Sequence, residues 1–282
     1  MFRNTVKTTV LLAGLGGLLV AIGSLFGTVG AVVGLALGLA LVGASYWKSD
    51  ALAIRAARAV PADEAALPEY FSIMRELSAR ADLPMPRLYV SPEAQPNAFA
   101  TGRSPEHAAV AVTEGLLRVC TWDEVRGVLA HELAHVRNRD ILIGSVAAAV
   151  ATGISFIANL AMWGAMLGGS DEDDNPIALL ATALLAPLAA GLLQMALSRS
   201  REFEADRHGA ELLGTGEPLA RALEKLEQSA ARVPMDVSPS QAQAYIVNPL
   251  TGRQVRFANL FRTHPTTEER VARLRAGARL AA

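Results

Sequence analysis

Four long stretches without a charged residue constrain this chain more than any other feature. They cover residues 8–26, 29–47, 141–167 and 177–197. The shortest have 19 residues, and about 20 apolar residues in a helix cross the roughly 30 Å hydrocarbon core of a membrane. We therefore predict four transmembrane helices. The alternatives are a signal peptide for the first stretch and a buried hairpin of a globular domain for the last two.

These stretches divide the chain into two hairpins and two polar blocks. We expect a transmembrane hairpin over 1–47, half of a catalytic domain over 48–140, a second hairpin over 141–197 and the other half over 198–282. Lys and Arg flank the stretches on one side only, and the two short connecting loops carry neither. Because basic flanks mark the cytoplasmic side, both polar blocks and both termini are expected to be cytoplasmic, at a bacterial-type inner membrane.

Charge and cysteine content narrow the function further. The chain of 282 residues has 51% hydrophobic residues and a formal net charge of −1. Its mean hydropathy of +0.29 is high for an ordinary globular domain. A nucleic-acid partner usually requires a basic face, so the net charge of −1 argues against a nucleic-acid-binding protein. The single cysteine, Cys120, excludes an internal disulfide and fits a reducing compartment.

The first polar block contains the motif H-E-x-x-H, with histidines at His131 and His135. Four residues apart on a helix, two imidazoles lie on one face and can bind the same metal ion. The carboxylate of Glu132 can then take a proton from a metal-bound water. A helix is indicated because Thr121 and Glu124 have the spacing of a capping box ahead of a helical apolar pattern.

A small β-sheet is expected ahead of this motif. An amphipathic helix over 69–81 precedes a short strand at 87–90, and residues 97–102 and 108–113 read as paired strands joined by a turn. An exposed edge of such a sheet can bind an extended peptide by strand addition. The alternative is that the sheet only covers the metal helix.

The second polar block offers a third metal ligand. A catalytic zinc ion has three protein ligands and one open position. Glu202 and Asp206 share a helical face, four residues apart, and can act as ligand and supporting carboxylate. Glu204 is a competing ligand on another face of the same helix. Alternatively, these carboxylates form a solvated surface and pair with neighbouring arginines.

With these motifs in place, the chain resembles the HtpX family of membrane-integral zinc metalloproteases, relatives of the CAAX prenyl endopeptidases and the Oma-type proteases. The matching stretches extend over nearly the whole chain: residues 45–47, 97–102, 131–135, 198–206, 263–265 and 268–270. The resemblance implies one zinc ion per chain, with Glu202 as the third ligand. It also implies that Asp206 hydrogen-bonds a ligand histidine and that His264 donates to the oxyanion. Arg270 and Asn97 are expected to support the oxyanion or the substrate.

The expected fold is a mainly α membrane protein with four transmembrane helices and a zincin-like α+β cytoplasmic catalytic domain containing a small β-sheet. The expected function is a zinc metalloendopeptidase for quality control and stress response. It would cleave misfolded, surplus or unassembled membrane proteins at the cytoplasmic face, with the lipid bilayer as its other partner. The alternatives are a prenyl-protein-type protease and a non-catalytic membrane scaffold that contains zinc.

Overall fold

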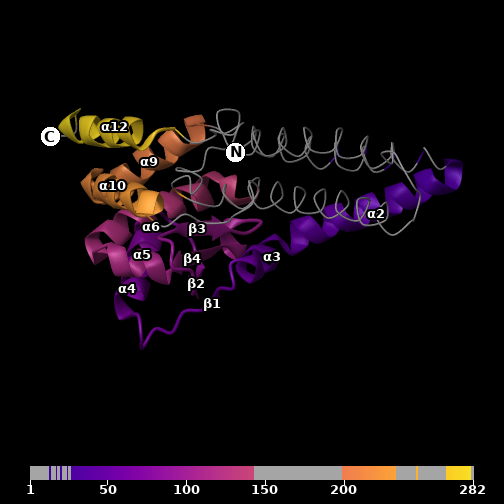
Figure 1. The fold of residues 1–282 in the computed structure, drawn as a ribbon, viewed down its shortest axis with the longest axis horizontal. Helices are drawn as coiled ribbons and strands as arrows, with labels where there is room; N and C mark the ends of the chain where they lie inside the picture. The colour runs from indigo at the N-terminus through magenta and orange to yellow at the C-terminus, as the bar shows by residue number, and fades with distance from the viewer. Residues whose placement is uncertain are drawn as a thin grey trace.

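One long helix extends from the body that holds the sheet (Figure 1). The computed structural model describes residues 13, 17, 20, 24, 27–142, 199–232, 246 and 265–280. Helix α2 (Gly27–Trp47) points away from the body that holds the sheet and the remaining labelled helices (Figure 1). Helix α3 (Ser49–Ala56) follows after Lys48 and lies where α2 meets this body (Figure 1).

The predicted transmembrane stretches fall mostly outside the described residues. Residues 29–47 lie within α2, so their helical conformation is confirmed. In the ranges that the structure describes, no helix combines the length and the apolar character that a membrane crossing requires. Most of 8–26, nearly all of 141–167 and all of 177–197 lie outside those ranges. The four membrane crossings and the four-part division of the chain stay predictions.

A four-stranded sheet forms one layer of the body. Its strands are β1 (Val60–Pro61), β2 (Arg87–Ser91), β3 (Ala98–Thr101) and β4 (Ala109–Thr113), in the order β1-β2-β4-β3. Strand β2 runs parallel to β4, with Arg87 opposite Ala109, and β3 runs antiparallel to β4. The predicted pairing of 97–102 with 108–113 is thus confirmed, with a 3-10 helix, η1 (Pro105–His107), in the connection. Strand β3 is an edge of the sheet.

Helix α6 (Trp122–Asn138) is the centre of the helical layer. It packs against the edge strand β3 and, most extensively among the helices, against α4 (Pro68–Arg80), α9 (Arg199–Leu213) and α10 (Glu217–Arg232). Helices α5 (Glu114–Val119) and α12 (Thr267–Leu280) complete the body. The amphipathic helix predicted at 69–81 is confirmed as α4, shifted by one residue at each end.

The start of α6 is fixed by the predicted capping box. The Thr121 hydroxyl accepts a hydrogen bond from the Glu124 backbone N–H at 3.4 Å, and the Glu124 carboxylate accepts one from the Thr121 N–H at 2.8 Å. Lys225 of α10 adds an ion pair to Glu124 at 2.7 Å. These bonds satisfy backbone donors that a helix leaves unpaired at its first turn. They hold α6, and the motif on it, in a fixed register.

Two glycines allow α6 to approach its neighbours closely. A Cβ on Gly127 would lie 2.4 Å from the backbone nitrogen of Leu219, at the start of α10. A Cβ on Gly209 of α9 would lie 3.1 Å from the backbone nitrogen of His131. Because α9 comes so near to α6 at this histidine, a side chain on α9 can reach the same point in space as the two imidazoles.

Candidate metal centre

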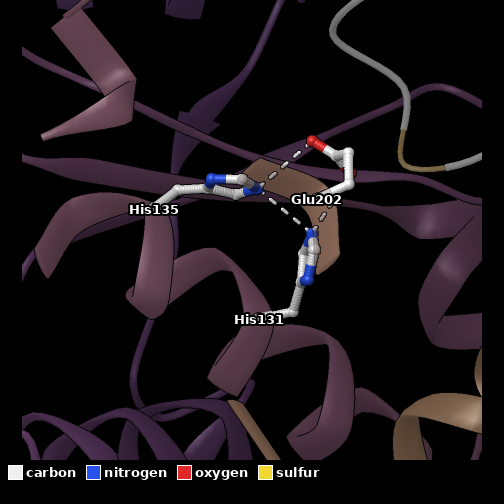
Figure 2. A group of neighbouring side chains, drawn as sticks. All are labelled: His131, His135 and Glu202. Carbon is white, nitrogen blue, oxygen red and sulfur yellow. Dashed lines mark hydrogen bonds and ion pairs between the residues drawn. The ribbon is translucent and has the colours of Figure 1, made fainter. Parts of the chain in front are cut away.

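The two histidines of α6 point their Nε2 atoms at one another. His131 and His135 are one helical turn apart, and their Nε2 atoms are 3.2 Å apart. Their ring planes are nearly perpendicular, at 89°. Figure 2 shows both rings directed at a common point next to the carboxylate of Glu202. This is the arrangement expected when one small cation draws both nitrogens to itself.

Glu202 of α9 completes a cluster of three donors. Its two carboxylate oxygens lie 3.8 Å from His131 Nε2 and 3.7 Å from His135 Nε2. The three donor atoms of the cluster all lie within 4.8 Å of one another. Glu204, the competing carboxylate, is exposed and is not one of the three. Of the two candidates, the structure therefore brings Glu202 to the histidines.

The spacing and chemistry of these donors fit zinc. Tetrahedral zinc with ligands about 2.0–2.2 Å away holds its ligand atoms roughly 3.3–3.5 Å from each other. The observed 3.2 Å between the two nitrogens is close to this range, and each nitrogen has one oxygen of Glu202 nearby, Oε2 at 3.8 Å from His131 and Oε1 at 3.7 Å from His135. Two imidazole nitrogens and one carboxylate are also a common ligand set of catalytic zinc, which keeps a fourth position for water or substrate.

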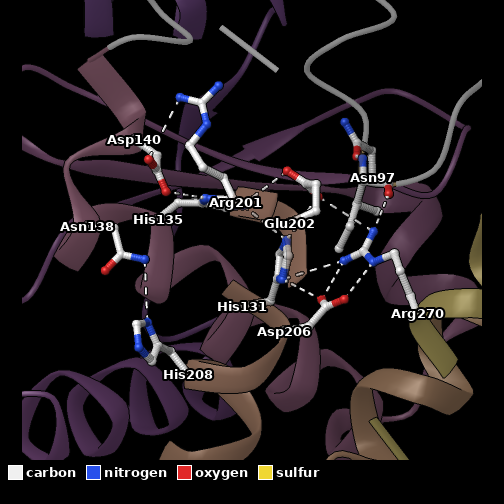
Figure 3. A network of polar contacts seen from close by, with 11 residues as sticks. Asn97, His131, His135, Asn138, Asp140, Arg201, Glu202, Asp206, His208 and Arg270 are labelled. Carbon is white, nitrogen blue, oxygen red and sulfur yellow. Dashed lines mark hydrogen bonds and ion pairs between the residues drawn. The ribbon is translucent and has the colours of Figure 1, made fainter. Parts of the chain in front are cut away.

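Each histidine is oriented by an acidic partner on its other nitrogen. His131 Nδ1 lies 3.0 Å from an oxygen of Asp206, and His135 Nδ1 lies 3.2 Å from an oxygen of Asp140 (Figure 3). A hydrogen on Nδ1 that is donated to a carboxylate leaves Nε2 with a lone pair for the metal. Asp206 has the place that the family resemblance implies, whereas Asp140 was not among the predicted site residues.

Asp140 reaches the site because α6 ends abruptly. Arg139 has φ +57° and caps the helix in the left-handed conformation, which turns the next residue back toward the last turn. The half of the site around Asp140 also contains Arg201, a buried side chain whose Nη1 lies 3.8 Å from Asp140. An acidic residue five positions after the second histidine could have indicated this partner from the sequence. It would have done so only if the end of the helix at residue 139 had also been predicted.

Arg270 is buried behind Asp206. Its side chain is 2% exposed. Its Nε and Nη2 donate to the two oxygens of Asp206 at 2.9 and 2.7 Å, and Nη1 donates to the backbone oxygen of Ile246 at 2.9 Å. The Nη2 atom is also 3.5 Å from His131 Nδ1. Nδ1 of His131 cannot donate a hydrogen to Asp206 and accept one from Arg270 at the same time. Its contact with the Asp206 carboxylate is the shorter one, so Nδ1 carries a hydrogen and donates it to Asp206.

The charges around the histidines favour a cation. Burial by itself would lower the pKa of His135, but the hydrogen bond with Asp140 and two nearby glutamates raise it to about 9. Burial would raise the pKa of Asp206, but the Arg270 guanidinium and the hydrogen bond with His131 lower it to about 2. The carboxylates that favour a proton on His135 favour a divalent ion in the same place.

Glu132 lies buried between this cluster and the sheet. Glu132 is 5% exposed. Burial raises the pKa of Glu132, and the neighbouring carboxylate of Glu202 acts in the same direction, while the two histidines and a hydrogen bond from the Ala100 backbone oppose the shift. A carboxylate with a raised pKa is a better base for water than an ordinary surface glutamate. Ala100 is on β3, so the glutamate lies next to the edge strand.

The remaining predicted residues occupy other places. The side-chain oxygen of Asn97 accepts a hydrogen bond from the backbone N–H of Ile246 at 3.0 Å. Asn97 thus binds the backbone N–H of Ile246, and Arg270 binds the backbone oxygen of the same residue. His264 lies outside the described residues. Nδ1 of His208 on α9 is 3.4 Å from the Asn138 amide nitrogen (Figure 3).

Comparison with known proteins agrees with this geometry. Residues 64–278 match the family model described as peptidase family M48. A protease HtpX homolog from Syntrophobacter fumaroxidans is 53% identical over 277 residues, which are 95% of this chain and 98% of that protein. A protease HtpX homolog from Burkholderia mallei is 50% identical over 278 residues, 96% of each.

A solved structure has a related fold. The crystal structure of S. mikatae Ste24p superposes with a TM-score of 0.52 at 20% sequence identity. The match covers 97% of this chain and 66% of that chain, so the present protein spans about two thirds of the other. At this identity the likeness concerns the fold alone.

Proposed function

This chain belongs to peptidase family M48, and we propose that it cleaves misfolded or surplus membrane proteins at the cytoplasmic face of a bacterial-type inner membrane. It is a zinc-dependent metallopeptidase, as its family and its near-full-length HtpX relatives indicate. The observation that carries the proposal is the cluster of His131, His135 and Glu202, with Glu132 buried beside it.

In this proposal the three clustered side chains hold the zinc ion. When bound, zinc supplies a Lewis acid that activates water and polarises the scissile carbonyl. Glu132 accepts a proton from the attacking water and returns it to the leaving amine. His264 donates to the oxyanion, a role that follows from the family resemblance. Asp206 and Asp140 keep the ligand histidines in the required tautomer and orientation.

Arg270 has a positioning role in this scheme rather than the oxyanion role expected from the sequence. Two of its nitrogens are bonded to Asp206 and a third to a backbone oxygen. A guanidinium bonded to both oxygens of a carboxylate fixes the plane of that carboxylate. Arg270 thereby fixes Asp206, and Asp206 in turn fixes the ring of His131.

The substrate is proposed to lie as an added strand along β3. This strand is the edge of the sheet next to α6, and the backbone of Ala100 on it contacts Glu132. An extended peptide paired with an edge strand receives backbone hydrogen bonds whatever its side chains are. Such binding requires an unfolded segment, which suits a protease that acts on misfolded chains.

Membrane attachment rests on the four uncharged stretches and on the HtpX relatives. With the stretches crossing the bilayer, the basic flanks place both polar blocks, and the metal centre, on the cytoplasmic side. Substrate segments that emerge from the bilayer on that side would then be within reach of β3.

A reconstituted system tests this function. The full chain is placed in proteoliposomes together with a membrane protein that exists as a stable and a destabilised variant. We expect cleavage of the destabilised variant only, at cytoplasmic segments identified by mass spectrometry, and none with Glu132→Gln. Equal cleavage of both variants, or cleavage confined to the opposite face, would overturn the proposed substrate class while leaving the peptidase activity intact.

A further inference from the structure

A basic cavity lies between helix α3 and strand β2. It has a volume of about 450 Å³ and is bounded by α3, the residues that follow it, and one face of β2. Three arginines line it, Arg55, Arg58 and Arg87, with Asp50 as the single acidic lining residue. Ligand pockets typically have volumes of about 300–1,000 Å³, so the space suits a small molecule better than a bare ion.

The positive charge of this cavity is only partly balanced. Arg87 is paired with Asp50 through Nη2 at 2.5 Å, and Arg58 is paired through Nη2 with Glu93, outside the lining, at 2.5 Å. Arg55 is exposed and has no ion pair with any residue in the described ranges. Each pair uses one terminal nitrogen of a guanidinium that carries five N–H donors. An anion in the cavity would meet donors from three arginines.

The backbone presents one of these arginines in an unusual way. Arg58 has φ +51°, the left-handed conformation, just after the end of α3. Glycine usually occupies that position because other residues adopt it at an energetic cost. Here an arginine occupies it, and this residue lines the cavity together with Arg55. Such locally unfavourable backbone is found preferentially at binding sites.

The position of the cavity indicates where its anion comes from. Helix α3 begins two residues after Trp47, the last residue of the uncharged helix α2. Trp47 is exposed, and the guanidinium of Arg103 lies 5.1 Å from its ring. Trp gathers at the headgroup level on both sides of a membrane, and Lys and Arg gather there on the cytoplasmic side. In Figure 1 the cavity-forming helix α3 lies at the junction of α2 and the body.

We propose that this cavity binds the phosphate of an anionic phospholipid headgroup at the cytoplasmic surface. The inference rests on the proposed membrane attachment, since it requires α2 to enter the bilayer beside the cavity. Arginine binds phosphate oxygens with paired N–H donors, and Tyr89 also lines the same space. A bound headgroup would fix the catalytic body at a constant height and orientation above the bilayer.

The test measures lipid retained by the purified full chain. Protein is reconstituted into nanodiscs of phosphatidylcholine alone, or of phosphatidylcholine and phosphatidylglycerol in equal parts, then released into detergent and examined by native mass spectrometry. Wild type is expected to retain phosphatidylglycerol. The double variant Arg55→Gln/Arg58→Gln is expected to retain about tenfold less of it, because charge-assisted hydrogen bonds are lost. Arg118→Gln, an exposed arginine on α5, is the matched control and should behave as wild type.

Four outcomes decide between the proposal and its alternatives. Equal retention by the double variant and wild type would overturn the proposal. Retention of inorganic phosphate by lipid-free protein, with no phosphatidylglycerol retained, would assign the cavity to free phosphate and overturn the lipid source. Unchanged cleavage of an unfolded substrate in detergent by the double variant is expected and shows that it is folded. Release of the wild type from membranes by carbonate would instead contradict the membrane attachment itself.

Discussion

Asp140 lies 3.2 Å from the Nδ1 atom of His135, although it comes after the end of the helix that carries this histidine. Together with the contact between Asp206 and His131, it gives each candidate zinc histidine its own carboxylate. The two halves of the site are therefore built alike, one by a residue close in sequence and the other by a residue from α9.

Asp140→Asn should weaken zinc binding while the protein stays folded. The amide can still accept a hydrogen bond, but it no longer strengthens the imidazole as a ligand. Loss of such a partner typically lowers metal affinity about 10- to 100-fold. Competition with a chelating dye measures the affinity. Asp123→Asn, the same change at an exposed position of α6, is the control. Equal zinc affinities of the two variants would contradict the role given to Asp140.

Glu202→Gln should lose most of its zinc on dialysis against a chelator, whereas Glu204→Gln should keep it. The two residues are on one helix, but only Glu202 is within the donor cluster. Its carboxylate supplies both a ligand atom and a negative charge. Metal content after dialysis, measured by atomic emission, distinguishes the variants. Zinc loss in Glu204→Gln with retention in Glu202→Gln would mean that the wrong carboxylate has been assigned.

Arg270→Met should destabilise the protein strongly. It leaves Asp206 buried without its cation, and breaking a buried ion pair from one side costs about 3–5 kcal/mol. The comparison is Arg273→Met on the same helix, where an exposed arginine pairs with Glu269 and about 1 kcal/mol or less is expected. Denaturant unfolding in detergent gives both values. Similar losses of unfolding free energy in the two variants would contradict the large contribution given to the buried pair of Arg270 and Asp206.

Gly127→Ala and Gly277→Ala should have opposite effects on stability. At Gly127 the added methyl group meets the backbone of Leu219, and overpacking of this kind costs about 1–3 kcal/mol. At Gly277 a Cβ meets no described atom within 4 Å, so the better helix propensity of alanine should stabilise α12 by roughly 0.5–1 kcal/mol. Thermal unfolding would contradict this account if Gly127→Ala were neutral.

Local patterns in the sequence predicted the centre of the site well. The capping box and apolar spacing gave the helix that carries His131 and His135, and the hairpin pattern gave the pairing of β3 with β4. These features depend on neighbours within a few residues. Their physical causes are therefore visible in the sequence itself.

Contacts between distant segments were the part that the sequence did not reveal. The parallel pairing of β2 with β4 joins strands across a longer connection. The bond between Asp206 and Arg270 links residues 64 positions apart, so an arginine expected near the substrate turns out to be buried behind a carboxylate. Asp140 was missed because its position depends on a left-handed turn at Arg139, a residue with no glycine-like preference for it.

Zinc content and cleavage of an unfolded substrate, measured together for wild type and Glu132→Gln in detergent, test the central claim most directly. The account predicts about one zinc ion per chain in both proteins and cleavage by wild type alone, because the glutamine keeps the shape of the site but cannot accept the proton of water. Cleavage by Glu132→Gln at the rate of wild type would contradict the assignment of Glu132 as the base.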